Sequence, residues 1–215
     1  MAEVTRRSVA LGLAAGGGAL LIGCQGRSIA ATPRRPRADL YDCDGCEAVA
    51  ERSPATLGWR LQLADAAEPG ERMVLHGRVT LPDGRTPAPG VVIYAHQTNA
   101  AGLYANGTPE TSWSRRHGAL RGWVKTDAAG RYRFDTIKPA PYPDRSMPAH
   151  VHLFVAEPGR PPYYIDDAVF AGEFRVDARY RAAQELRGGS GIVTLARERD
   201  SLIARRDIVL ERHPG

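Results

Sequence analysis

The stretch HGRVTLPDGRTPAPGVVIYA, residues 76–95, holds two apolar runs separated by a turn. Pro82, Asp83 and Gly84 mark that turn, because Pro fixes its own backbone angle and Gly tolerates conformations that other residues avoid. Comparable runs, rich in β-branched and aromatic residues, recur between Gly and Pro turns along the chain. The predicted strands are 73–80, 90–96, 120–125, 132–136, 150–155, 168–174, 192–196 and 207–210. This series predicts an all-β protein with an antiparallel β-sandwich core and long loops, and a short C-terminal helix over 177–186.

Composition narrows the class of protein. The chain has 215 residues, of which 43% are hydrophobic and 25% charged, as is typical of a soluble globular protein with one domain and extensions. The formal net charge is +5, but there is no long basic run, so no nucleic-acid partner is indicated. Three cysteines are too few for a fold held together by disulfides.

The first 24 residues read as an export signal. Arg6 and Arg7 precede an apolar run over 9–23, which is shorter than the roughly 20 residues that a membrane-spanning helix needs. The run ends in LIGC (21–24), which resembles the lipobox of bacterial lipoproteins, where the cysteine is lipidated. We therefore expect export by the twin-arginine route and a lipid anchor on Cys24 in the periplasm or at the cell surface. The alternatives are a plain cleaved signal and a buried helix.

The next segments link this signal to the folded part. Residues 25–40 are rich in Pro and Arg without periodicity, so we expect a flexible tether there, followed by a domain over 41–215. Cys43 and Cys46 form a C-x-x-C pair at the start of the domain. A structural disulfide is favoured because exported proteins meet oxidising compartments, while a zinc half-site and a redox pair stay open.

The segment MPAHVHLF (147–154) carries the strongest chemical signal. Successive side chains of a strand point to opposite faces, so His150 and His152 share one face and present two imidazole nitrogens together. Such a pair can bind a metal ion. Tyr142, eight residues earlier, lies between two prolines that restrict its backbone, and Tyr104 lies further upstream.

These segments together resemble the intradiol ring-cleavage dioxygenases, the superfamily of protocatechuate 3,4-dioxygenase and catechol 1,2-dioxygenase, in a secreted branch. The resembling stretches are NAAGLY (99–104), RGWVKTDAAGRYRFDTIKPAPYP (121–143), PAHVH (148–152) and VFAGE (169–173). The resemblance implies a β-sandwich with active-site loops and a non-haem Fe(III) ion bound by Tyr104, Tyr142, His150 and His152. Phenolate oxygen suits a hard trivalent cation, and two phenolates with a hydroxide would balance its charge.

The implied reaction cleaves a small aromatic diol with O2 to a cis,cis-muconate-type product, with Tyr142 leaving the metal and accepting a substrate proton. Two positions depart from the family pattern in the expected substrate pocket. Met147 stands where the family has an arginine, and Asp167 stands where it often has a glutamine. Arg145 is a candidate to supply the missing cation, and Trp123 is a further candidate to line the pocket.

Two other functions fit parts of the sequence. Residues 76–95 and 126–134 also resemble prealbumin-like accessory domains, which would make the chain a non-catalytic binding module of an exported lipoprotein. A zinc or copper site would use His150 and His152 with a further donor. The Tyr and His set favours the dioxygenase over both. Association into a homo-oligomer is compatible with the family resemblance.

The export signal generates the first prediction. Mature protein from the native host should carry lipid on Cys24 and sediment with membranes, because two or three acyl chains hold a protein at a bilayer. Mass spectrometry of the N-terminal peptide measures the modification, and a Cys24→Ala chain is the control. An unmodified Cys24 on the mature chain would contradict the lipoprotein hypothesis.

Overall fold

The computed structural model describes residues 35–215. The predicted signal peptide, Cys24 and most of the expected tether lie outside these residues. Within the described part, no helix is both long enough and apolar enough to cross a membrane.

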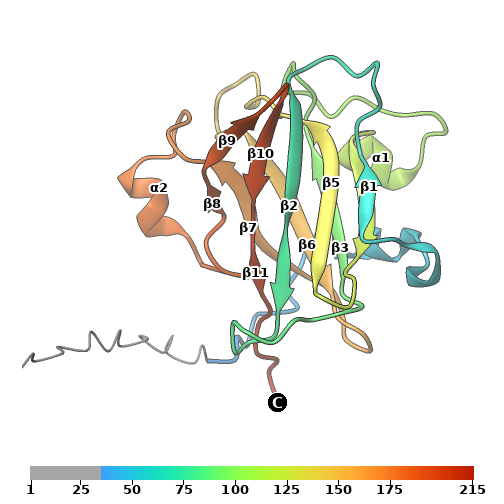
Figure 1. Cartoon of the computed structure of the whole chain (residues 1–215), viewed down its shortest axis with the longest axis vertical. Helices are drawn as coiled ribbons and strands as arrows, with labels where there is room; N and C mark the ends of the chain where they lie inside the picture. Colours follow the sequence, from blue (N-terminus) through green and yellow to red (C-terminus); the bar gives the residue numbers. More distant parts are fainter. Residues whose placement is uncertain (1–34) are drawn as a thin grey trace, which may run out of the picture. The chain divides into compact units, whose positions relative to one another are not determined.

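Two β-sheets form the body of the described domain, and the sheet holding β2 and β5 lies in front of the sheet holding β3 and β6 (Figure 1). The first sheet has the order β1 (Arg60–Gln62), β5 (Arg131–Ile137), β2 (Arg72–Thr80), β10 (Ser201–Arg205) and β9 (Leu195–Glu198), with β11 (Ile208–Val209) also on β2. The second has the order β4 (Arg121–Lys125), β3 (Val92–Gln97), β6 (His150–Ala156), β7 (Tyr163–Phe170) and β8 (Ile192–Val193). The helices are α1 (Ser112–His117), α2 (Ala178–Ala183) and the 3₁₀ turns η1 (Cys46–Glu51) and η2 (Pro54–Thr56).

The all-β prediction is confirmed, with differences in detail. The central pairs β2–β5, β3–β4, β3–β6 and β6–β7 are antiparallel, as expected. The pairs β1–β5, β2–β10, β2–β11 and β7–β8 are parallel, and long connections rather than hairpins join their strands. The strand expected over 168–174 was placed too late: β7 begins at Tyr163 and ends before a turn in which Gly172 has φ 82°. The expected helix is α2, which is followed by four more strands.

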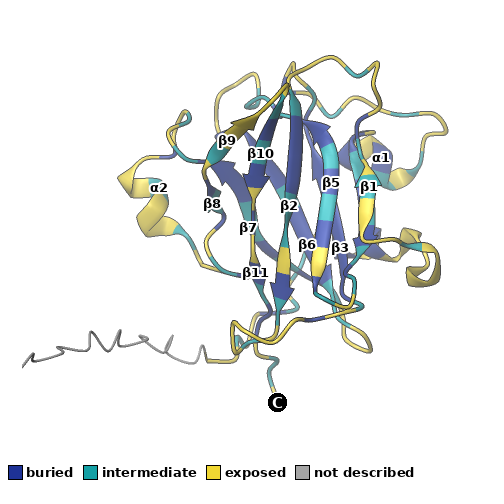
Figure 2. Cartoon of the chain, in the orientation of Figure 1, coloured by how far each residue is buried: buried dark blue, intermediate teal, exposed yellow. Residues whose placement is uncertain are grey.

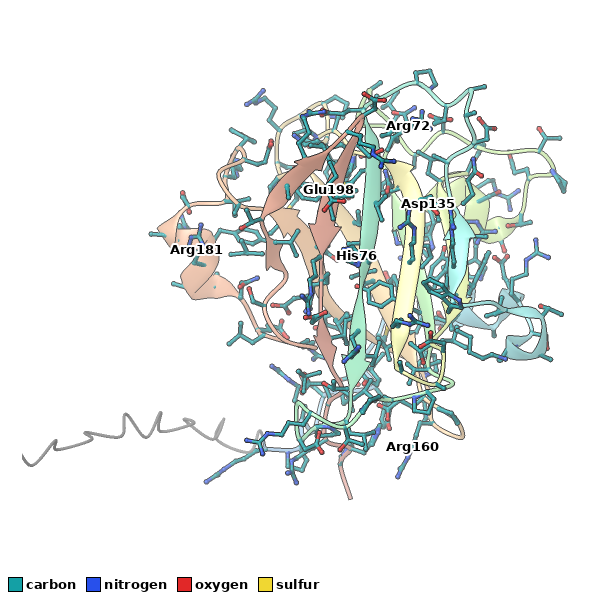
Figure 3. All side chains as sticks on the ribbon, viewed as in Figure 1. Arg72, His76, Asp135, Arg160, Arg181 and Glu198 are labelled. Atoms are coloured by element: carbon teal, nitrogen blue, oxygen red, sulfur yellow. A yellow bond between two sulfur atoms is a disulfide. The ribbon has the colours of Figure 1, made fainter. Side chains whose placement is uncertain are left out.

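Alternation along the strands builds the core between the sheets. On β2, Met73, Leu75 and Val79 point inward and are at most 1% exposed. Figure 2 shows buried residues along the central strands of both sheets. The opposite face of β2 and β5 is mostly polar, and Figure 3 labels His76 and Asp135 on it. On this sheet the two-residue period thus separates an apolar interior from a mostly charged outer surface.

The segment preceding Cys43 packs on the domain, so the expected tether over 25–40 is corrected at its end. Leu40 is fully buried in the main core cluster. Arg37 lies 3.6 Å from Glu211, and the Asp39 carboxylate accepts a hydrogen bond of 2.7 Å from Arg187. The Pro and Arg composition is typical of a linker, but here the charged residues find partners and one leucine fills a core position.

Leu40→Ala should therefore lower the free energy of unfolding by about 2–5 kcal/mol, the usual cost of deleting a buried leucine side chain. Urea unfolding followed by circular dichroism measures this change. Leu81→Ala is the matched control, because Leu81 is 40% exposed and its truncation should change stability by about 0.5 kcal/mol or less. Equal effects in the two variants would mean that the segment does not belong to the folded core.

Candidate metal centre

The two predicted histidine ligands lie side by side on β6, on the face of the second sheet that points away from the sandwich core. Val151 and Leu153 on the opposite face are each 1% exposed within the main cluster. His150 is 2% exposed, while the His152 side chain keeps 27% of its surface. One strand therefore anchors the core and presents both imidazoles.

Two loops bring the tyrosines to the same place. The Asn99 side chain shapes the first loop by accepting hydrogen bonds of 3.0 Å from the backbone N–H groups of Ala101 and Leu103. Gly102 has φ 79°, and a Cβ atom there would lie 2.1 Å from the backbone oxygen of Pro141. Only glycine permits this approach, which sets the loop of Tyr104 against the segment that carries Tyr142.

The four predicted ligand atoms converge. The hydroxyl oxygens of Tyr104 and Tyr142 are 2.9 Å apart. The Tyr142 oxygen lies 3.1 Å from Nε2 of His150 and 3.4 Å from Nε2 of His152, and the two Nε2 atoms are 3.0 Å apart. Two oxygens and two nitrogens thus form one compact cluster from three separate segments of the chain.

The hydrogen bonds at Nδ1 determine which nitrogen of each histidine ring carries the hydrogen and which presents a lone pair to the cluster. Nδ1 of His150 lies 2.7 Å from the carbonyl oxygen of Pro148, which can only accept, so Nδ1 carries the hydrogen. Nδ1 of His152 likewise donates to the Asp167 carboxylate at 3.0 Å. Both Nε2 atoms of the neutral rings are therefore acceptors, and no hydrogen lies between them. A cation satisfies such a set better than the two phenol protons can, so the residues fit a metal ion.

Burial keeps these groups uncharged while no cation is bound. Burial, with the hydrogen bond to Tyr142, raises the pKa of the Tyr104 phenol far above its usual value. Burial also raises the pKa of Tyr142 and lowers the pKa of His150. The phenols stay protonated without a cation, so metal binding must release their protons.

A stack of rings that the sequence analysis missed backs the cluster. His96 on β3 pairs with His152 across the sheet, and their ring centroids are 4.4 Å apart. His117 at the end of α1 stacks on the other side of His96 at 4.0 Å, with the ring planes 2° apart. The Tyr94 hydroxyl lies 2.8 Å from Nδ1 of His117. The alternation along the predicted strand already put Tyr94 and His96 on one face. The sequence did not show that His96 would lie opposite His152 on the neighbouring strand.

Comparison with known proteins identifies the family. A family model described as a dioxygenase matches residues 49–210. The chain is 37% identical over 100 residues to catechol 1,2-dioxygenase 1 of Acinetobacter lwoffii and 39% identical over 90 residues to the protocatechuate 3,4-dioxygenase beta chain of Burkholderia cepacia. The chain belongs to the intradiol ring-cleavage dioxygenase superfamily.

The matched parts cover 39% of this chain in both alignments, but only 31% and 38% of these relatives. Solved structures support the fold over a longer range. The dioxygenase domain of a carbohydrate-binding fusion protein from Streptomyces sp. SirexAA-E superposes with a TM-score of 0.55 at 24% identity, over 72% of this chain and 88% of that domain. Catechol 1,2-dioxygenase of Acinetobacter sp. ADP1 gives 0.54 at 22% identity, over 72% and 57% of the two chains.

The other predicted site residues of this dioxygenase-family chain are more scattered. Met147 lines a cavity of about 550 Å³, and Asp167 lines one of about 230 Å³; Tyr180 of α2 lines both. The Arg145 guanidinium carbon lies 4.0 Å from the Phe174 ring centroid on the exposed surface, so the structure does not bring Arg145 to the ligand cluster.

Trp123 and the cysteine pair lie on the η1 side of the same sheet. Trp123 lines neither cavity: its Nε1–H donates to the Ala48 carbonyl at 3.1 Å and its ring stacks on Tyr94 at 4.9 Å. Its expected place in the pocket is thus corrected to packing beneath η1, because its strand position faces that segment. Cys43 and Cys46 form a disulfide at the start of η1.

The ring stack generates a prediction on pH. Burial, reinforced by the positive charge of Arg116, lowers the pKa of His117 to about 4 from an ordinary 6.5. Between these values the unfolded chain binds a proton that the folded chain does not, so stability falls as pH falls from about 6.5 to 4. The slope from this group approaches about 1.4 kcal/mol per pH unit.

His117→Asn should reduce that slope, because asparagine can still accept from Tyr94 but does not titrate. Urea unfolding at pH 7, 6 and 5 for both chains measures the difference. A variant that loses as much stability as the unsubstituted chain over this range would show that His117 titrates normally in the fold.

Proposed function

We propose that this chain is a non-haem Fe(III) intradiol dioxygenase that cleaves a catechol-type ring with O2 to a cis,cis-muconate-type product. The observation that carries the proposal is the convergence of Tyr104, Tyr142, His150 and His152, with both Nε2 atoms close to the Tyr142 oxygen and the Tyr104 oxygen beside it. Family membership supports ring cleavage. The donor set supports iron, since phenolate oxygen suits a hard trivalent cation better than zinc or copper, while imidazole binds all three metals.

The bound iron would act as a Lewis acid that activates the catechol. Tyr104, Tyr142, His150 and His152 would hold it. Tyr142 has a second task in the proposal: its oxygen lies in contact with both imidazoles and with Tyr104, and the side chain is only partly buried. Its phenolate can therefore accept a proton from a catechol hydroxyl that reaches the cluster.

The non-catalytic binding module is the less favoured function, because a binding module has no need for two phenols and two imidazoles brought within hydrogen-bond distance. The substrate is proposed at the level of a small aromatic diol. Export, a lipid anchor on Cys24 and a periplasmic or cell-surface location remain part of the proposal. The predicted signal over 1–24 supports them.

Ligand substitutions test this function. His150→Ala and His152→Ala should each lose most of the iron, because each removes a permanent neutral donor. Tyr142→Phe should keep part of the iron but change the visible absorption and slow turnover, because it removes one phenolate and the proposed base. The measurements are iron per chain, the visible spectrum and oxygen uptake with catechol.

His76→Ala is the matched control, because His76 lies on β2 of the other sheet, as Figure 3 shows. It should retain full iron content, a burgundy colour from tyrosinate-to-iron charge transfer and full activity. Full iron and activity in His150→Ala or His152→Ala would falsify the site, and with it the proposed reaction.

A further inference from the structure

The two histidines of the cluster are held from behind by different groups. The Nδ1–H of His150 donates to a neutral backbone carbonyl, that of Pro148, at 2.7 Å. The Nδ1–H of His152 donates to the carboxylate of Asp167 at 3.0 Å. The two imidazoles are therefore chemically unequal, because a carboxylate partner makes a ligating imidazole a stronger electron donor than a carbonyl does.

A β-bulge aims Asp167 at His152. The pairing of β6 with β7 runs from Val151 opposite Ala168 to Leu153 opposite Ile165, so two residues of β7 oppose the single residue His152. These two residues are Asp166 and Asp167. The bulge turns the two neighbouring acids to different partners.

Asp166 is occupied elsewhere. Its carboxylate accepts backbone N–H hydrogen bonds of 2.9 Å from Leu186 and 3.1 Å from Arg187, in the loop after α2. Asp167 keeps the contact with His152, and its side chain is 22% exposed. Only one of the two acids is thus available to the candidate metal centre.

Asp167 lies close enough to the histidines to be considered as a metal ligand itself, since ligand atoms of His150, His152 and Asp167 all fall within 4.8 Å of one another. The geometry argues against that role. Asp167 contacts Nδ1 of His152, whereas the Tyr142 oxygen and Nε2 of His150 lie against Nε2 at the opposite side of the ring. A metal ion among the four converging atoms would have the His152 ring between itself and the carboxylate.

We propose that Asp167 is a positioning residue that orients His152 and supplies a fixed negative charge to the metal centre through that imidazole. Together with the two phenolates, the carboxylate brings the negative charge supplied by the protein's own side chains to three. The arrangement stabilises Fe(III) relative to Fe(II). This inference rests on the proposed iron site, and it assigns a function to a position where the family resemblance led us to expect glutamine.

The test compares Asp167→Asn and Asp167→Gln with Asp167→Glu. The amides keep a hydrogen-bond acceptor for Nδ1 but remove the charge, while glutamate keeps the charge. Each amide variant should still bind iron, but with an affinity for Fe(III) lowered about 10–100-fold relative to Fe(II). That change raises the midpoint potential by about 59 mV for each tenfold.

The charge-transfer band of the amide variants should move to longer wavelength, because a more oxidising iron accepts an electron from tyrosinate more easily. Asp167→Glu should restore part of both shifts. The readouts are iron per chain, chelator competition, the visible spectrum and a spectroelectrochemical titration. None of them depends on turnover.

Asp144→Asn is the matched control, because it removes the same charge from an exposed carboxylate whose hydrogen bonds come from Ser146, so that its charge acts on Tyr142 only at a distance and less than that of Asp167. It should shift the potential much less than Asp167→Asn. Equal shifts would overturn the inference, because they would trace the effect to general electrostatics.

Three further outcomes separate the hypotheses. An unchanged potential and spectrum in iron-loaded Asp167→Asn and Asp167→Gln overturn the role of Asp167 and leave the proposed function intact. Complete loss of iron in both amides with full iron in Asp167→Glu overturns it by making Asp167 a ligand. Unsubstituted protein that binds no Fe(III) overturns the proposed function and this inference together.

Discussion

The pleat of β6 is the constraint on which both the core and the candidate metal centre depend. Val151 and Leu153 fill the space between the sheets, and this fixes His150 and His152 on the opposite face. A shift of the pairing by one residue would bury the imidazoles in an apolar core and expose two aliphatic side chains. The free energy that holds the core register therefore also holds both histidines on the outer face of the sheet, while the hydrogen bonds at Nδ1 set the orientation of each ring.

The rest of the cluster is more costly to assemble. Two imidazole lone pairs face one another at 3.0 Å, and two partly buried phenols share the protons available to them. Desolvated polar atoms that lack full partners destabilise a fold by about 1–3 kcal/mol each. A bound cation offsets this free-energy cost, because it coordinates the imidazole lone pairs and replaces the phenol protons. Metal binding and stability should then be coupled, as in other sites whose ligands must lose protons.

The sequence was sufficient wherever a local pattern decided the outcome. Alternation predicted the central strands and the shared face of His150 and His152, and the family resemblance supplied Tyr104 and Tyr142. Pairing between distant strands could not be predicted from the sequence. For example, β10 pairs in parallel with β2, and no turn sequence joins the two strands directly. The contact of Asp167 depends on a bulge, and the stacking of His96 depends on cross-strand register. Both are set by the packing of whole strands rather than by neighbouring residues.

The rings of His96 and His117 that stack behind His152 are electrostatically compatible with a cation at the candidate metal centre. A protonated imidazole beside a trivalent cation would be strongly unfavourable, and burial keeps the pKa of His96 far below its usual value. His96 is 5% exposed and lies between His152 and His117, so its ring remains neutral and offers a flat, polarisable surface to the ligand. Neutral rings thus back one side of His152 while the charged Asp167 holds its Nδ1 edge. The negative charge acts through a single defined hydrogen bond, and the packing that fixes the ring plane adds no charge of its own.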